Sequence, residues 1–396
     1  MADNKEPLRT DKKTGIPLLL SSSPHIVSPV NTSVLMGNML AALAPSAVFG
    51  VVLFGVPALL TILVSVASAA AAEALFRLAA RREVRVRDLS AAVTGLLLAL
   101  ILPPSMPLWM TALGAVFAVI VAKEFFGGLG GNVFNPALIG RAFLLMSFPA
   151  AMTKWHFSPG PFPLRLTDAM SSATLVDGVS GVTPLGIVKA GSGVSGLGRV
   201  LLQAHISPSD SWGSTMKALF IGWHPGSIGE SPAWLILAAF AFLLIRRTID
   251  WRAPAGMIAA AFVSSFVLGL DPLFSVLSGG LLFGAVFMAT DYVTAPLTAA
   301  GKLIFGIGAG IISILIRKWG TYPEGVSYGI LIMNGFTPFL NKLLPRKYGF
   351  VPKKKAAAPP QTAPAVPAAP PSGVSASAPG TAAAPAAPDA KERPHE

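Results

Sequence analysis

Long apolar stretches alternate with short polar segments along most of this chain. A helix that crosses the hydrocarbon core of a bilayer, about 30 Å thick, needs about 20 apolar residues. Ten stretches approach this length: Ser33–Phe54, Val56–Ala80, Asp88–Leu102, Met106–Ala122, Asn135–Phe148, Ala233–Ile245, Pro254–Leu270, Pro272–Ala289, Ala300–Ile316 and Gly325–Leu340. Several are shorter than about 18 residues and flanked by Gly or Pro, which is typical of broken or re-entrant helices. The pattern predicts an all-α polytopic membrane protein with about ten transmembrane helices.

The apolar stretches divide the chain into five regions. These are a polar leader (1–32), a first group of five helices (33–148), a long loop (149–232), a second group of five (233–350) and a tail (351–396). The loop is too long to be a simple connector, and loops of this length usually carry function. The tail opens with three lysines and continues as an Ala/Pro-rich sequence, which predicts disorder. The lysines can contact anionic lipid head groups, or they can be a solvated stop signal.

The two groups of helices show signs of an internal repeat. Residues 89–98 resemble residues 274–283 at an offset of 185. Because each group has an odd number of predicted helices, the second group would be inverted relative to the first. Inverted repeats place a site or pathway between the halves, near the middle of the bilayer. A chance likeness between two Gly/Leu-rich helices is the alternative explanation.

Composition agrees with a membrane location. Hydrophobic residues make up 53% and charged residues 12% of the 396 residues, whereas about 25% of a soluble domain is charged. The chain has no cysteine, which excludes disulfides, thiolate metal sites and cysteine-ligated iron–sulfur clusters on it. The five histidines are dispersed without ligand spacing, so we expect no metal site.

The net charge of +12 is distributed unevenly. Lys and Arg gather in the leader, in residues 77–87 and 246–252, and in the tail, whereas the long loop has few for its length. Basic residues accumulate in the cytoplasmic loops of membrane proteins, so the excess does not imply nucleic acid as a partner. The asymmetry predicts a bacterial inner-membrane protein with both termini in the cytoplasm and residues 149–232 outside. Arg317 and Lys318 form the one local exception.

The strongest local motif lies in the long loop, where residues 177–185 read DGVSGVTPL. Small residues near Thr183 leave its hydroxyl accessible. Asp177, six positions earlier, can hold a divalent metal or orient a donor while the hydroxyl is modified. The segment predicts an exposed acceptor site, with an ordinary Gly/Ser turn as the alternative.

A Gly-rich segment, residues 127–135, is the second candidate site. Its glycines permit a break in the helix and close approach of the backbone to a planar ring. Asn132 and Asn135 supply amide donors and acceptors at one-turn spacing, suited to a flavin edge. A tightly packed re-entrant turn with Asn caps is the alternative. Arg141, inside the next predicted helix, must pair or face a polar cavity, where it can neutralise a reduced flavin or a phosphate. A structural pair with a carbonyl is the alternative.

Two acidic residues are candidates for an ion pathway. Glu73 lies within the second predicted helix, and carboxylates inside a membrane are functional candidates by default. Its alternative role is an ion pair with Arg77, one turn later. Asp291 follows the eighth predicted helix, where simple capping at the interface is the alternative.

Three separated motifs together resemble one known family. Residues 122–143 resemble a signature shared by the D subunit of the Rnf complex and the B subunit of the sodium-pumping NADH–quinone reductase. Residues 287–293 include an Asp that this family also has at a helix end. Residues 177–183 resemble the sequence to which a flavin transferase attaches FMN, with Val182 in place of the usual Ala. The resemblance covers about residues 20–350, and the short leader fits the Rnf protein better.

The resemblance implies a membrane subunit of an ion-translocating ferredoxin:NAD oxidoreductase that moves Na⁺ or H⁺. It implies FMN joined through its phosphate to Thr183, within the motif formed by Asp177, Gly178, Ser180 and Gly181, and riboflavin as a candidate non-covalent cofactor. No complete active site is expected on this chain alone. The implied partners are the A and E membrane subunits, the G flavin subunit, the B and C peripheral subunits, membrane lipid and the flavin transferase. The alternatives are the quinone-reductase protein and a non-redox inverted-repeat transporter or channel.

Overall fold

The computed structural model describes residues 9–10, 17–18, 31–83, 88–155, 183–189, 211–222, 224–320, 322 and 324–343. Helices dominate these residues, and the only strands among them are the short antiparallel pair β1 (Arg9–Thr10) and β2 (Pro17–Leu18). The all-α prediction is therefore confirmed for the described part of the two helical groups. The predicted tail, residues 351–396, lies outside the described residues.

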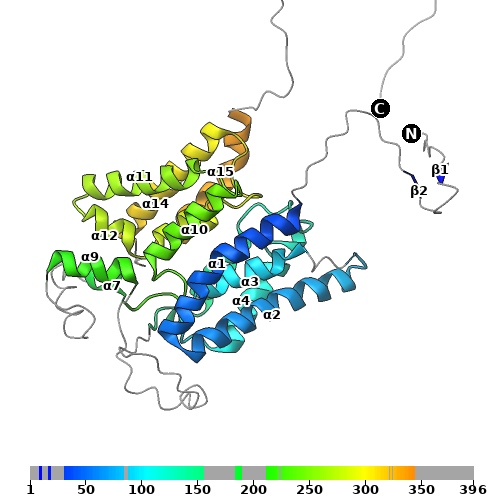
Figure 1. Cartoon of the computed structure of the whole chain (residues 1–396), viewed down its shortest axis with the longest axis horizontal. Helices are drawn as coiled ribbons and strands as arrows, with labels where there is room; N and C mark the ends of the chain where they lie inside the picture. Colours follow the sequence, from blue (N-terminus) through cyan, green and yellow to red (C-terminus); the bar gives the residue numbers. More distant parts are fainter. Residues whose placement is uncertain are drawn as a thin grey trace, which may run out of the picture. The chain divides into compact units, whose positions relative to one another are not determined.

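The helices form a first half, a connecting segment and a second half (Figure 1). The first half contains α1 (Thr32–Phe54), α2 (Val56–Ala79), α3 (Ser90–Leu100), α4 (Leu108–Ile120), the 3₁₀ turn η2 (Glu124–Phe126), α5 (Pro136–Ser147) and α6 (Pro149–Met152). The connecting segment contributes α7 (Pro184–Ile187) and α9 (Trp212–Ile221). The second half contains α10 (Ala233–Ile245), α11 (Arg252–Val267), α12 (Pro272–Leu277), α13 (Leu281–Phe283), the π-helical turn η4 (Gly284–Met288), α14 (Ala299–Trp319) and α15 (Val326–Leu343).

Local sequence explains where the first two helices begin and end. The Asn31 side chain accepts a hydrogen bond from the Val34 amide at 2.9 Å and so caps the start of α1. Gly55 ends α1 with φ of 74°, a conformation that favours glycine. Pro57 then lies in the first turn of α2, where its missing N–H costs no helical hydrogen bond.

Each of the ten predicted stretches falls on helical structure, but the helices differ in length. Four are long and apolar enough to cross a bilayer by length and composition: α1, α2, the stretch Leu108–Phe126 and α14. Four others, α3, α5, α10 and α11, are apolar but shorter. The number of crossings and the inverted arrangement of the halves stay predictions.

The eighth predicted stretch is not one helix. Helix α12 ends at Leu277, α13 begins at Leu281, and η4 continues it. Between them Gly279 and Gly280 have φ of 63° and 67°, which side-chain-bearing residues rarely adopt. Residues 274–283 therefore contain a turn, whereas residues 90–98 lie within α3. The two segments of the proposed repeat thus differ in local structure.

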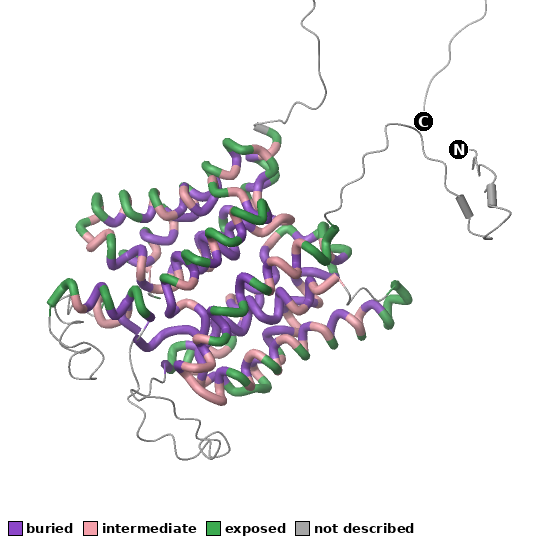
Figure 2. The backbone as a smooth tube through the Cα atoms, viewed as in Figure 1, coloured by how far each residue is buried: buried purple, intermediate pink, exposed green. Residues whose placement is uncertain are grey.

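Small residues let the helices pack closely. Gly306 and Gly310 of α14 lie against the α11 backbone, and a side chain at either position would collide with it. Across the halves, α1 packs on α10 (Figure 1). Helix α5 also packs on α15. Buried residues line the inner sides of the helices, and exposed residues follow their outer sides (Figure 2). Many of the exposed side chains are large and apolar, including Ile245, Phe266 and Val267, which suits contact with lipid.

Candidate functional site

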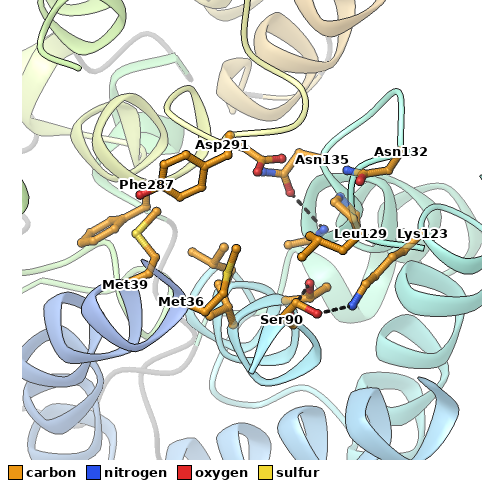
Figure 3. Close-up of a pocket in the computed structure, with 15 residues that line it drawn as sticks. Met36, Met39, Ser90, Lys123, Leu129, Asn132, Asn135, Phe287 and Asp291 are labelled. Carbon is orange, nitrogen blue, oxygen red and sulfur yellow. Dashed lines mark hydrogen bonds between the residues drawn. The ribbon is translucent and has the colours of Figure 1, made fainter. Parts of the chain in front are cut away.

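A cavity of about 50 Å³ lies between the two halves (Figure 3). Its lining includes three residues singled out from the sequence, Asn132, Asn135 and Asp291. Lys123 lines the cavity on one side, and apolar residues of α1 and η4 such as Met39 and Phe287 line it on the other (Figure 3). The fold therefore brings the Gly-rich segment of the first half to Asp291 of the second half, which the sequence placed 156 residues after Asn135.

The Gly-rich segment holds its two asparagines in different ways. Gly127, Gly128 and Gly130 have φ near 100°, so this backbone depends on glycine and breaks the helical path as predicted. Asn135 caps α5, since its side-chain oxygen accepts from the Ala137 amide at 3.0 Å. Asn132 donates to the Phe134 carbonyl at 3.3 Å, and its own buried oxygen has no partner among the described residues.

Asp291 presents a carboxylate to this cavity. Thr294 donates a hydrogen bond to it at 3.0 Å, and the described residues provide it with no ion pair within 4 Å. Burial raises the pKa of Asp291. The buried Asp291 carboxylate and the free Asn132 oxygen line the same cavity (Figure 3), and oxygen atoms of these two kinds are ligands of hard cations.

The cavity has room for a small ligand. Its volume of about 50 Å³ exceeds the roughly 10–15 Å³ that a single water molecule needs, so an ion with bound water fits in it. The role of Asn132 and Asn135 at a flavin edge stays a prediction.

Glu73 lies in a buried cluster of four charges beside the cavity. Lys123 contacts the Glu73 carboxylate at 2.8 Å and the Ser90 hydroxyl at 2.6 Å. Arg77 lies 3.4 Å from Glu73 and 3.1 Å from Glu124. The expected pair of Glu73 with Arg77 is present, but Lys123 makes the shorter contact. The Glu73 side chain is fully buried and does not itself line the cavity.

Arg141 lies at a different place between the halves. It donates to the Ile101 carbonyl and to Glu324, and it lies 3.5 Å from Glu230. These residues line a second cavity of about 10 Å³, which does not include Asn132 or Asn135. Sequence reasoning missed Glu230 and Glu324. The only sign of a function for either residue in the sequence was that it is an acidic residue next to a glycine, in a mainly uncharged segment.

Thr183 is buried, with 7% of its surface exposed, which contradicts the expectation of an exposed acceptor. The physical reason is α7: Leu185 packs with Met216, Leu219 and Phe274 and holds the segment against the second half. The Thr183 hydroxyl accepts from the Gly186 amide at 3.2 Å and caps this turn. The rest of the predicted motif, Asp177, Gly178, Ser180 and Gly181, lies outside the described residues.

Comparison with known proteins covers most of the chain. Residues 19–349 match the model of the NQR2, RnfD, RnfE family. The chain is 40% identical to the D subunit of the proton-translocating ferredoxin:NAD(+) oxidoreductase complex of Clostridium ljungdahlii over 338 residues, 83% of this chain and 96% of that protein. It is 38% identical to the D subunit of the Na(+)-translocating ferredoxin:NAD(+) oxidoreductase complex of Acetobacterium woodii, covering 84% and 95% of the two chains. Relatives of nearly equal similarity thus carry the names of different ions.

Proposed function

The chain belongs to the NQR2, RnfD, RnfE family, and from this membership we propose that it is the D subunit of an ion-translocating ferredoxin:NAD oxidoreductase complex. The observation that carries the function is identity of 38–40% over at least 95% of relatives named as that protein. These relatives match the Rnf assignment rather than the quinone-reductase alternative. The chain works within a complex, and the A and E membrane subunits, the G flavin subunit and the B and C peripheral subunits are its proposed partners.

Membrane vesicles test this function directly. Vesicles from cells that lack the chain are expected to lose NAD⁺ reduction by reduced ferredoxin together with the ion uptake that it drives. Re-expression of the chain restores both, because the two processes depend on one assembled complex. Restoration of NADH-dependent quinone reduction instead would assign the chain to the quinone reductase.

Covalent FMN on Thr183 is the second part of the proposal. The motif of residues 177–183 supports it, and so does the capping geometry, because an esterified threonine oxygen keeps lone pairs that can accept the Gly186 N–H. FMN at this position would supply one- and two-electron chemistry, while the chain fixes its attachment point against the second half. Since Thr183 is buried, the transferase needs this segment to open or to be modified before it packs.

The third part concerns ion movement and orientation. Asp291 and the Asn132 oxygen hold the transported cation in the cavity between the halves. By the distribution of basic residues, this cavity faces the cytoplasm together with both termini, and residues 149–232 lie outside. The non-covalent riboflavin that the family resemblance implies stays a prediction.

Replacing Asp291 by asparagine is expected to raise the ion concentration needed for half-maximal turnover at least about tenfold, equivalent to about 1.4 kcal/mol. The reason is the loss of the only carboxylate charge among the described residues that line this cavity. Turnover of vesicles over a range of sodium concentrations and of pH measures the effect. Asp271→Asn is the matched control, because that carboxylate does not line this cavity and accepts hydrogen bonds from the Trp212 ring N–H and the Phe274 amide instead. Unchanged ion dependence in Asp291→Asn would remove this residue from the pathway.

A further inference from the structure

The interface between the halves is built differently at its two ends. At one end lies the cavity of Asp291, where no described basic side chain pairs with that carboxylate. At the other end an ion pair joins the halves, since Arg141 of α5 contacts Glu324, which lies two residues before the start of α15. Among the described residues, an ion pair therefore joins the halves at Arg141, and none joins them at Asp291.

Arg141 holds together three parts of the chain that are distant in sequence. Its guanidinium donates to the Ile101 carbonyl after α3, to Glu324 of the second half, and lies 3.5 Å from Glu230 before α10. The side chains of Arg141, Glu230 and Glu324 are 5%, 11% and 16% exposed. Breaking such a buried pair without replacing it leaves a desolvated charge, so the contact favours one arrangement of the halves strongly.

Residues 283–288 lie between the cavity of Arg141 and the cavity of Asp291. Phe283 and Met288 line the cavity of Arg141, Phe287 lines that of Asp291, and all three are fully or almost fully buried. The backbone here changes from the Gly279–Gly280 turn to α13 and then to the π-helical turn η4. Departures of this kind from regular helix are frequent at sites that rearrange.

We propose that Arg141, with Glu324 and Glu230, is an ion-pair gate that closes the outer end of the ion path between the halves. Opening requires Arg141 to leave the two carboxylates and the segment of Phe283 and Met288 to shift. This inference rests on the proposed ion transport. The assignment of the gate to the outer side of the membrane rests on the proposed orientation.

The charges around the gate support a role for protons in its opening. Burial, together with the neighbouring Glu324, raises the pKa of Glu230 to about 7. The described charged and titratable groups that act on this cluster are Arg141 on α5, Arg317 on α14, Glu324, and the Tyr328 phenol of α15. Above that pH Glu230 is ionised and adds its attraction for Arg141. Below it, Arg141 keeps Glu324 as its charged partner.

Cysteine accessibility tests the gate, because the chain has no cysteine of its own. Met288→Cys reports on the space beneath Arg141, and Gly213→Cys on α9 is an exposed reference with open space around a new side chain. Right-side-out vesicles containing the whole complex are treated with a membrane-impermeant methanethiosulfonate, and the chain is isolated on a denaturing gel. We expect Met288→Cys to be protected in the parent chain and labelled at least about tenfold faster after Arg141→Gln. Glu324→Gln should do the same, and Glu230→Gln should give a smaller increase.

Two controls separate the possible failures. Arg252→Gln removes an arginine from a part-exposed pair with Asp250 and should leave Met288→Cys protected. If Arg141→Gln prevents assembly, Glu324→Gln still tests the gate, because in that variant Arg141 can keep its contacts with the Ile101 carbonyl and Glu230. If Gly213→Cys reacts only after permeabilisation, the orientation is wrong, and the same comparison in permeabilised vesicles decides the gate. Protection of Met288→Cys in assembled Arg141→Gln and Glu324→Gln variants would overturn the proposal.

Discussion

Replacing Thr183 by valine is expected to abolish the flavin fluorescence of this chain on a denaturing gel. Valine has nearly the shape of threonine but lacks the oxygen that would form the phosphoester. The change also removes the cap of α7, which costs about 1 kcal/mol, so the protein should still insert and assemble. Complete loss of the covalent band without loss of the protein is therefore the expected result.

Two variants control this experiment. Thr183→Ser keeps a hydroxyl and a cap, so its fluorescent band should be retained. Thr174 lies in a similar Ser/Thr-rich stretch, where Asp168 also precedes the threonine by six positions. The variant Thr174→Val should therefore retain the fluorescent band. A band that survives in Thr183→Val and disappears in Thr174→Val would move the attachment site. A wild-type protein without any band would remove the covalent flavin from the proposal and revive the non-redox transporter.

Residue pattern alone located most of the helices. The bounds of α1, α2 and α10 agree with the apolar stretches to within one residue at each end, because long apolar segments leave few alternatives. The break at the Gly-rich segment was also readable, since positive φ favours glycine. The division of residues 272–289 was not predicted, because that segment is apolar throughout and only Gly279–Gly280 mark its turn.

The candidate site was only partly readable because its contacts are distant in sequence. Lys123 and Glu73 are 50 residues apart, and Arg141 and Glu324 are 183 apart. Local spacing indicates i,i+4 pairs such as Glu73 with Arg77, whereas it says nothing about pairing between helices. The burial of Thr183 was missed for the same reason, since it depends on Leu185 packing against residues of α9 and α12.

The buried charges around Lys123 should have the largest effect on stability. Lys123 is 1% exposed, and its described partners are Glu73 and Ser90. Replacing Glu73 by glutamine leaves this ammonium without its carboxylate in a desolvated site. Removal of one partner from a buried pair costs about 3–5 kcal/mol. We therefore expect Glu73→Gln to lower the thermal inactivation midpoint of the detergent-purified complex by many degrees, and Lys123→Met to do so as well.

Replacing both partners should restore much of this loss. In Glu73→Gln/Lys123→Met no unpaired charge remains on that contact, and Arg77 still meets Glu124 at 3.1 Å. Lys302→Met is the matched control: its pair with Asp250 is partly exposed, so its removal should cost less than about 1 kcal/mol.

The double variant also decides the role of Glu73, because it separates stability from transport. Normal ion-linked turnover in a stable double variant would make the Glu73 contact structural, whereas lost turnover would place Glu73 in the ion pathway. A double variant as unstable as either single one would contradict the ion pair as the source of the effect.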